Sequence, residues 1–282
     1  MLRFFQTGLV LLSIFLCACQ SSPEIQPNSS GDVKEEIATN PLPDAGKMIR
    51  KMITQDGCKD FVAEMRMTSE SISGKPSHVE VRLQRKYTDN VVSTFLTVLS
   101  PKEDSDKAIL ALENSEKPTE AFSYLAGLKK LAKLNSSRPL GFRGAKVTVQ
   151  ELLGMELGHY SHDTGERVNE DGKSLIRITF QAKPDLNLVF PRIVGYFHEK
   201  EEAPARFELF GENGELAKKL VIDEMKKIQD RQTVTQVTIE DVSQKLKLKM
   251  ETTKIEYDRG LSDKIFTEDY LKSFITGASN KR

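Results

Sequence analysis

The sequence predicts one mainly β domain, an antiparallel barrel or sandwich with a few helices. Segments with the two-residue alternation of β-strands recur about every 8–12 residues, with turn residues between them. One pair of segments flanks Asn213-Gly214, a dipeptide typical of tight β-hairpins. The spacing of the strands favours antiparallel pairing over the helical crossovers of βαβ units.

The first strands show which face of the sheet is apolar. In residues 78–87, HVEVRLQRKY, the apolar side chains of Val79, Val81 and Leu83 alternate with polar ones and therefore share one face. Residues 90–101 are apolar on both faces and end at Pro101. We therefore expect two consecutive strands here, the second with apolar side chains on both faces.

The later strands repeat this alternation. They are predicted at residues 173–182, 205–222 (two strands around the Asn-Gly turn), 232–241 and 244–253. In residues 244–253, three lysines occupy the face opposite the apolar one. A sheet with a charged outer face needs a cover for its other face, so either helices cover that face or it lines an apolar cavity.

Three short helices accompany the sheet. Asp44 is a plausible N-cap for a helix whose apolar stripe contains Met48, Ile49, Met52 and Ile53. The segment VTVQELLG, residues 147–154, opens with a capping box formed by a threonine and a glutamate three residues later. Thr267 is the expected N-cap of a closing helix.

The N-terminus has the pattern of a leader. An apolar run from Gly8 to Leu16 is too short to span a bilayer but has the size of a signal-peptide core. The order Leu16-Cys17-Ala18-Cys19 resembles a bacterial lipobox. The resemblance implies that residues 1–18 form a lipoprotein signal peptide, that Cys19 carries the lipid anchor, and that a flexible tether at residues 19–43 leads to one domain at residues 44–282.

The charge balance and the cysteine content exclude some kinds of partner and bond. The chain has 41 basic and 41 acidic residues, a balance that argues against a nucleic-acid partner. With Cys17 removed and Cys19 lipidated, Cys58 has no disulfide partner, and we expect it to be a small buried apolar residue. The only expected membrane attachment is the lipid anchor.

Little in the sequence points to catalysis. No phosphate loop, dinucleotide fingerprint or nucleophile elbow is present. His159 and His162 are three residues apart in a strand-like segment, which points them to opposite faces, so we expect surface histidines and no metal site. We therefore predict a protein that is not an enzyme and uses no cofactor; a hydrolase with an unrecognised site is the least favoured alternative.

One segment resembles a known family. Residues 120–154 resemble a segment of the LolA-like outer-membrane lipoprotein-sorting proteins, with the flanking regions agreeing in layout over roughly residues 44–275. The matching residues are Phe122, Tyr124, Leu125, Lys129, Lys130, Ser137, Arg138, Phe142, Gly144, Leu152 and Leu153. Ala126 stands where the family usually has proline. The resemblance implies a half-open antiparallel β-barrel, a curved sheet with a helical lid.

The resemblance also implies a function. Related carriers hold acyl chains of lipids or lipoproteins against an apolar concave sheet, so we expect lipoprotein-sorting or carrier-like activity, with a non-enzymatic protein-interaction or sensor module, and hence a possible envelope protein partner, as the alternative. Gln20 after the anchor implies the outer membrane, facing the periplasm. The candidate wall residues are Ile176, Ile178, Phe180, Phe207, Leu209, Leu246, Leu248 and Met250.

Overall fold

The computed structural model describes residues 41–53, 57–70, 77–114, 116–125, 128–135, 139–142, 145–148, 157–186 and 188–279. Pro41–Arg282 forms one compact unit. The predicted signal peptide, the Cys19 anchor and nearly all of the tether lie outside the described residues, as does the helix predicted to follow Thr148. No helix in the described ranges is both long enough and apolar enough to span a bilayer.

Antiparallel strands make up most of the described chain. The strands are β1 (Asp60–Glu70), β2 (Ser77–Tyr87), β3 (Val92–Ser100), β4 (Ala108–Asn114), β5 (Lys117–Leu125), β6 (Lys130–Leu134), β7 (Pro139–Phe142), β8 (Ala145–Thr148), β9 (Tyr160–His162), β10 (Glu166–Glu170), β11 (Lys173–Ala182), β12 (Arg192–His198), β13 (Ala203–Phe210), β14 (Leu216–Ile228), β15 (Arg231–Asp241) and β16 (Leu246–Tyr257). The helical elements are α1 (Ala45–Ile53), α3 (Glu268–Ser279) and the 3₁₀ turns η1 (Lys102–Asp104), η3 (Leu157–His159) and η4 (Asp263–Phe266).

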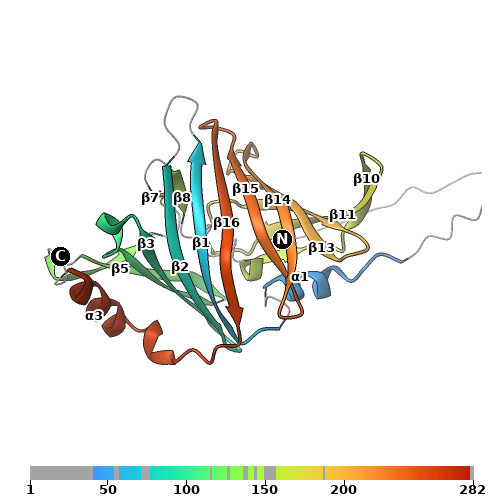
Figure 1. Cartoon of the computed structure of the whole chain (residues 1–282). Helices are drawn as coiled ribbons and strands as arrows, with labels where there is room; N and C mark the ends of the chain where they lie inside the picture. The colour runs from blue at the N-terminus through green and yellow to red at the C-terminus, as the bar shows by residue number, and fades with distance from the viewer. Residues whose placement is uncertain are drawn as a thin grey trace, which may run out of the picture. The chain divides into compact units, whose positions relative to one another are not determined.

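Fourteen of the strands form a single curved sheet. Its order is β10-β11-β12-β13-β14-β15-β16-β1-β2-β3-β4-β5-β6, with β9 paired to β11, and β7 and β8 form a separate hairpin (Figure 1). All neighbours on this path are consecutive in the chain except β16 and β1. The two ends of the path, β6 and β10, do not pair with each other, so the sheet is unclosed. The predicted half-open antiparallel barrel is confirmed.

The alternation predicted from the sequence determines the two faces of the sheet. We call the inner face the one whose side chains form the main apolar cluster, which strands β1, β2, β3, β11, β12, β13, β14, β15 and β16 all supply. Val79, Val81 and Leu83 of β2 are buried in this cluster, as expected. Cys58 is also buried in it, and burial raises the pKa of its thiol to about 11.

The two described helices lie on opposite faces. Asp44 caps α1, its Oδ1 accepting from the Lys47 N–H at 3.0 Å, and Met48 and Ile49 pack into the main cluster on the inner face. Thr267 caps α3 by accepting from the Tyr270 N–H at 3.2 Å. Because α3 packs on Phe95 of β3, whose neighbour Leu96 belongs to the main cluster, α3 covers the outer face.

Ion pairs cover much of the remaining outer face. Arg66 pairs with Glu80 at 2.9 Å and Arg82 with Glu64 at 2.7 Å, in both cases across β1 and β2. Lys247, one of the lysines predicted to face away from the core, pairs with Glu240 of β15. Exposed pairs of this kind add little stability individually, but they keep this face solvated.

Candidate functional site

The predicted wall residues gather on the inner face of the sheet. Six of them are buried in the main cluster, with side chains at most 3% exposed: Ile176, Ile178, Phe180, Phe207, Leu209 and Leu248. Met250 is half-buried and packs against the cluster, whereas Leu246, at the start of β16, is half-buried and lies outside it. The structure therefore brings seven of the eight residues together.

A glycine makes room for the aromatic rings of this face. Gly195 of β12 pairs with Ile178 on one side and Phe207 on the other. A Cβ at this position would lie 2.9 Å from ring atoms of both Phe197 and Phe207, closer than real Cβ atoms approach. The rings of Phe197 and Phe207 meet edge to face, with centroids 5.7 Å apart. The rings therefore pack closely around a backbone position that carries no side chain.

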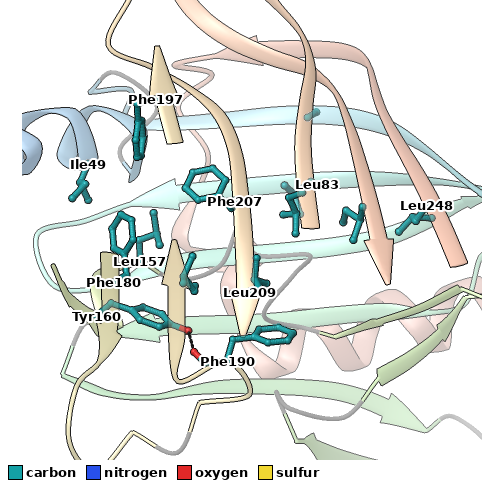
Figure 2. Packing of buried hydrophobic residues seen from close by; sticks show 14 of the residues in the cluster. Ile49, Leu83, Leu157, Tyr160, Phe180, Phe190, Phe197, Phe207, Leu209 and Leu248 are labelled. Carbon is teal, nitrogen blue, oxygen red and sulfur yellow. Dashed lines mark hydrogen bonds between the residues drawn. The ribbon is translucent and has the colours of Figure 1, made fainter. Parts of the chain in front are cut away.

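Two loops and α1 close the inner face over β11 to β13. Leu157 of η3 and Tyr160 of β9 are buried in the main cluster together with Phe190. The Tyr160 hydroxyl donates to the Phe190 carbonyl at 2.9 Å, which ties one loop to the other (Figure 2). Ile49 of α1 is buried in the same cluster as Phe197. Over these strands, the wall residues are therefore packed core.

A groove opens beside α1. It has an empty volume of about 460 Å³, partly open to solvent, and lies between α1, the turn and start of β13, and strands β14 and β15. Its lining is Met48, Lys51, Met52, Glu201, Glu202, Ala203, Pro204, Met225, Gln232 and Val234. Met48 also belongs to the main cluster, so the groove and the core are contiguous.

The chemistry of this groove suits a flexible apolar ligand. Its three methionines have unbranched, polarizable side chains that adapt to irregular shapes. Charged groups, the Lys51 ammonium and the Glu201 and Glu202 carboxylates, stand among the lining residues and can contact a polar end. The sequence signal for this site was the stripe of Met48 and Met52 on the first helix; nothing marked Met225.

The inner face also holds charged residues that the sequence analysis missed. Arg85 donates to both carboxylate oxygens of Glu113, at 3.0 and 2.7 Å, and both side chains are largely buried. Thr94, beside Arg85 in the β2–β3 register, is buried, and its hydroxyl has no hydrogen-bond partner among the described residues. Burial also raises the pKa of Tyr87. The alternation of β2 could have revealed Arg85, which shares the face of Leu83.

The histidines form no metal site in the described ranges. His159 is buried, and its Nε2 lies 2.6 Å from the Asn114 carbonyl oxygen, so the expectation that it lies on the surface was wrong. His162 is exposed, as expected, with its Nδ1 at 2.9 Å from the Asp163 carbonyl oxygen. No group of three or more His, Cys, Asp or Glu side chains in the described part of the chain could hold a metal ion.

Comparison with known proteins assigns the family. A family model described as an uncharacterized protein matches residues 90–273, more than half of the chain. The chain belongs to that family. No curated protein matches the sequence.

Solved structures of three bacterial proteins share the fold. An outer-membrane lipoprotein-sorting protein domain from Vibrio parahaemolyticus has a TM-score of 0.71 at 17% identity, with 80% of this chain and 97% of that chain covered. A DUF1329 family protein from Desulfovibrio piger has a TM-score of 0.71 at 18% identity, covering 80% and 96%. A LolA superfamily protein from Nitrosomonas europaea has a TM-score of 0.69 at 15% identity, covering 81% and 99%. The family member described here therefore has the LolA fold that the resemblance implied.

Proposed function

We propose that this chain is a lipid-anchored protein of the bacterial envelope that binds acyl chains of lipids or lipoproteins, as a lipoprotein-sorting or carrier-like protein. The observation that carries the proposal is the groove lined by Met48, Met52 and Met225, since these side chains give it an apolar part that is partly open to solvent and contiguous with the main cluster. Binding of this kind needs no catalytic residue, because each buried methylene contributes about 0.8 kcal/mol.

The inner face supplies the rest of the site. An acyl chain that enters the groove meets Met48 first and continues past α1 toward Phe197 and Phe207. Space for it comes from displacing the covering side chains of Leu157, Tyr160 and Phe190, which loops and short elements hold. Loop residues of this kind open at lower cost than the strands beneath them.

The proposed location rests on the N-terminal sequence. The lipobox-like order ending in Cys19 supports a lipid anchor, and Gln20 supports the inner leaflet of the outer membrane, facing the periplasm. A tether at residues 19–43 would leave the domain at residues 44–282 free to meet its ligand. The outer-membrane sorting domain of Vibrio parahaemolyticus, which shares the fold, is consistent with this setting.

A closed interaction or sensor module is the second candidate. The observation that favours it is the complete burial of Ile176, Ile178 and Leu209, each 0% exposed, which is what a filled core requires. In that case the inner face only stabilises the fold, and the protein acts through a surface that contacts an envelope partner.

Uptake of a fluorescent fatty acid by the folded unit, Pro41–Arg282, separates the two functions. A carrier takes up the probe, and Met225→Glu weakens the uptake by at least about tenfold because it places a carboxylate among the methionines of the groove. Val242→Glu is the matched control, since Val242 is 48% exposed and lies outside the groove. Native mass spectrometry should also find co-purified lipid. An empty protein that takes up no probe would leave only the interaction module.

A further inference from the structure

The tip of the β5–β6 hairpin exposes two leucines. Leu128 is 72% exposed, more than any other large apolar side chain in the described residues, and Leu125, the last residue of β5, is 44% exposed. The hairpin beneath them is well anchored, because Tyr124 and Leu131, a cross-strand pair, pack against the cluster under α3. The two leucines are therefore exposed to solvent at the end of a hairpin whose strands are packed against the protein.

The sequence around this tip is strongly basic. From Ala121 to Gln150, a range that extends past the hairpin, the sequence has no acidic residue and six basic ones, although the whole chain is neutral: Lys129, Lys130 and Lys133 in the hairpin, and Arg138, Arg143 and Lys146 after it. Lys133 pairs with Glu120 at 2.6 Å, farther from the tip. Lys129 and Lys130 are exposed next to the leucines and have no acidic partner in the described part of the chain.

We propose that this tip, with Leu125, Leu128, Lys129 and Lys130, docks on an anionic phospholipid surface. Exposed leucines gain by entering the boundary of the acyl chains, and adjacent lysines are attracted to the phosphates of anionic lipids. The docking adds to the proposed lipid anchor, on which it depends only for bringing the chain to a membrane. It would hold the domain in a fixed orientation there.

A membrane fits this tip better than a protein partner. A stable protein interface buries roughly 800 Å² on each side, with an apolar centre surrounded by complementary polar groups. The tip offers only two exposed leucines beside two exposed lysines. A lipid surface needs only shallow insertion together with charge attraction, and its negative charge complements the tip.

A fluorophore at position 128 tests the docking. Leu128→Cys in the full processed chain carries an environment-sensitive dye such as NBD, and Val242→Cys is the matched control at another exposed apolar position. Cys58 does not compete for the dye, because it is buried and its pKa is raised to about 11. Each labelled chain is mixed with vesicles of phosphatidylcholine alone or with phosphatidylglycerol added.

The expected result is a blue-shifted, brighter emission at position 128 with the anionic vesicles only, and no change at position 242. Replacing both lysines, Lys129→Gln with Lys130→Gln, should weaken the docking by about tenfold or more. Flotation with phosphatidylcholine vesicles reports the anchor separately. A chain without acyl groups fails to float, while its tip still responds to anionic lipid.

Three outcomes would overturn the proposal. One is an emission at position 128 that is unchanged by anionic vesicles. Another is an equal shift at positions 128 and 242, which means general adhesion. The third is a shift that appears without vesicles as protein concentration rises, which means that the tip binds a second protein molecule instead.

Discussion

The two flanks of the sheet bury their largest apolar clusters on opposite faces. In the flank formed by β10 to β13, the rings of Phe180, Phe197 and Phe207 fill the inner face. In the flank formed by β4 to β6, the inner face holds the small residues Ala111 and Ala121, and the larger cluster, with Leu110 and with Phe95 of the neighbouring β3, lies on the outer face.

The difference follows from what covers each flank. Loops and α1 close the inner face over the first flank, whose outer face instead carries arginines stacked on aromatic rings, Arg206 on Tyr196 and Arg192 on Phe210, each at 3.5 Å. Over the second flank α3 covers the outer face. The sheet is therefore continuous, but the face that carries its largest apolar cluster changes from one flank to the other. The inner face is accordingly covered to a different extent in the two flanks.

The largest expected losses of stability come from replacing a buried phenylalanine in the largest cluster of each flank. Phe180→Ala and Phe95→Ala should each lower the free energy of unfolding by about 3–5 kcal/mol, since both side chains are fully buried. Their local effects should differ, because Phe95 contacts Tyr270 and Phe274 of α3, with centroids 5.2 and 5.6 Å apart. Hydrogen exchange in α3 should accelerate only in Phe95→Ala; equal acceleration in both variants would contradict independent flanks.

A pair of glycine substitutions should show smaller effects of opposite sign. Gly195→Ala puts a Cβ against three phenylalanine rings and should cost about 1–3 kcal/mol of stability. Gly277→Ala, in α3, meets no atom within 4 Å and should add up to about 1 kcal/mol through helix propensity. Urea unfolding measures both. A tolerated alanine at position 195 would show that the first flank is loosely packed.

The smallest effect is a pH dependence at the edge strand β10. Hydrogen bonds from Arg167 and Ser174 lower the pKa of Glu199 to about 2. The folded state therefore favours the carboxylate, so this contribution is complete above the ordinary pKa of 4.5 and is lost as the pH falls toward 2. The protection of the β10 amides from hydrogen exchange, relative to their intrinsic rates, should fall over this range, because β10 contains Arg167. Glu199→Gln should remove the dependence, and its persistence would assign it to another carboxylate.

Alternation predicted the fold because burial and strand pairing follow from the same two-residue pattern. The alternation correctly predicted strands β2 and β11, and it correctly predicted which of their side chains lie on the inner face. It could not predict Met225, because irregular pairing between Ile222 and Met225 interrupts the alternation of β14. It also could not show that α3 packs on the outer face, since an amphipathic stripe predicts that a helix is packed but not on what.

Polar contacts between residues far apart in the chain could not be predicted from the sequence either. His159 is buried because its ring meets the carbonyl of Asn114, 45 residues away in the chain. Such a contact has no local signature, and a short segment rich in polar residues looks like surface. The candidate groove was visible only in part, through the methionines of α1, because its other wall comes from strands more than 150 residues later.

The pairing of β16 with β1 places the first and last strands of the sheet at its centre. Asp60 reinforces this seam, its carboxylate accepting from the N–H groups of Arg259 at 2.6 Å and Leu261 at 2.9 Å. During synthesis or export from the N-terminus, β1 can pair with β16 only after almost 200 further residues have emerged. The β1–β16 pairing therefore forms late, and its large sequence separation slows folding. A chain that stops before Leu246 leaves one edge of β1 unpaired, and this edge is open to proteolysis and to aggregation. The topology therefore exposes incomplete chains to degradation.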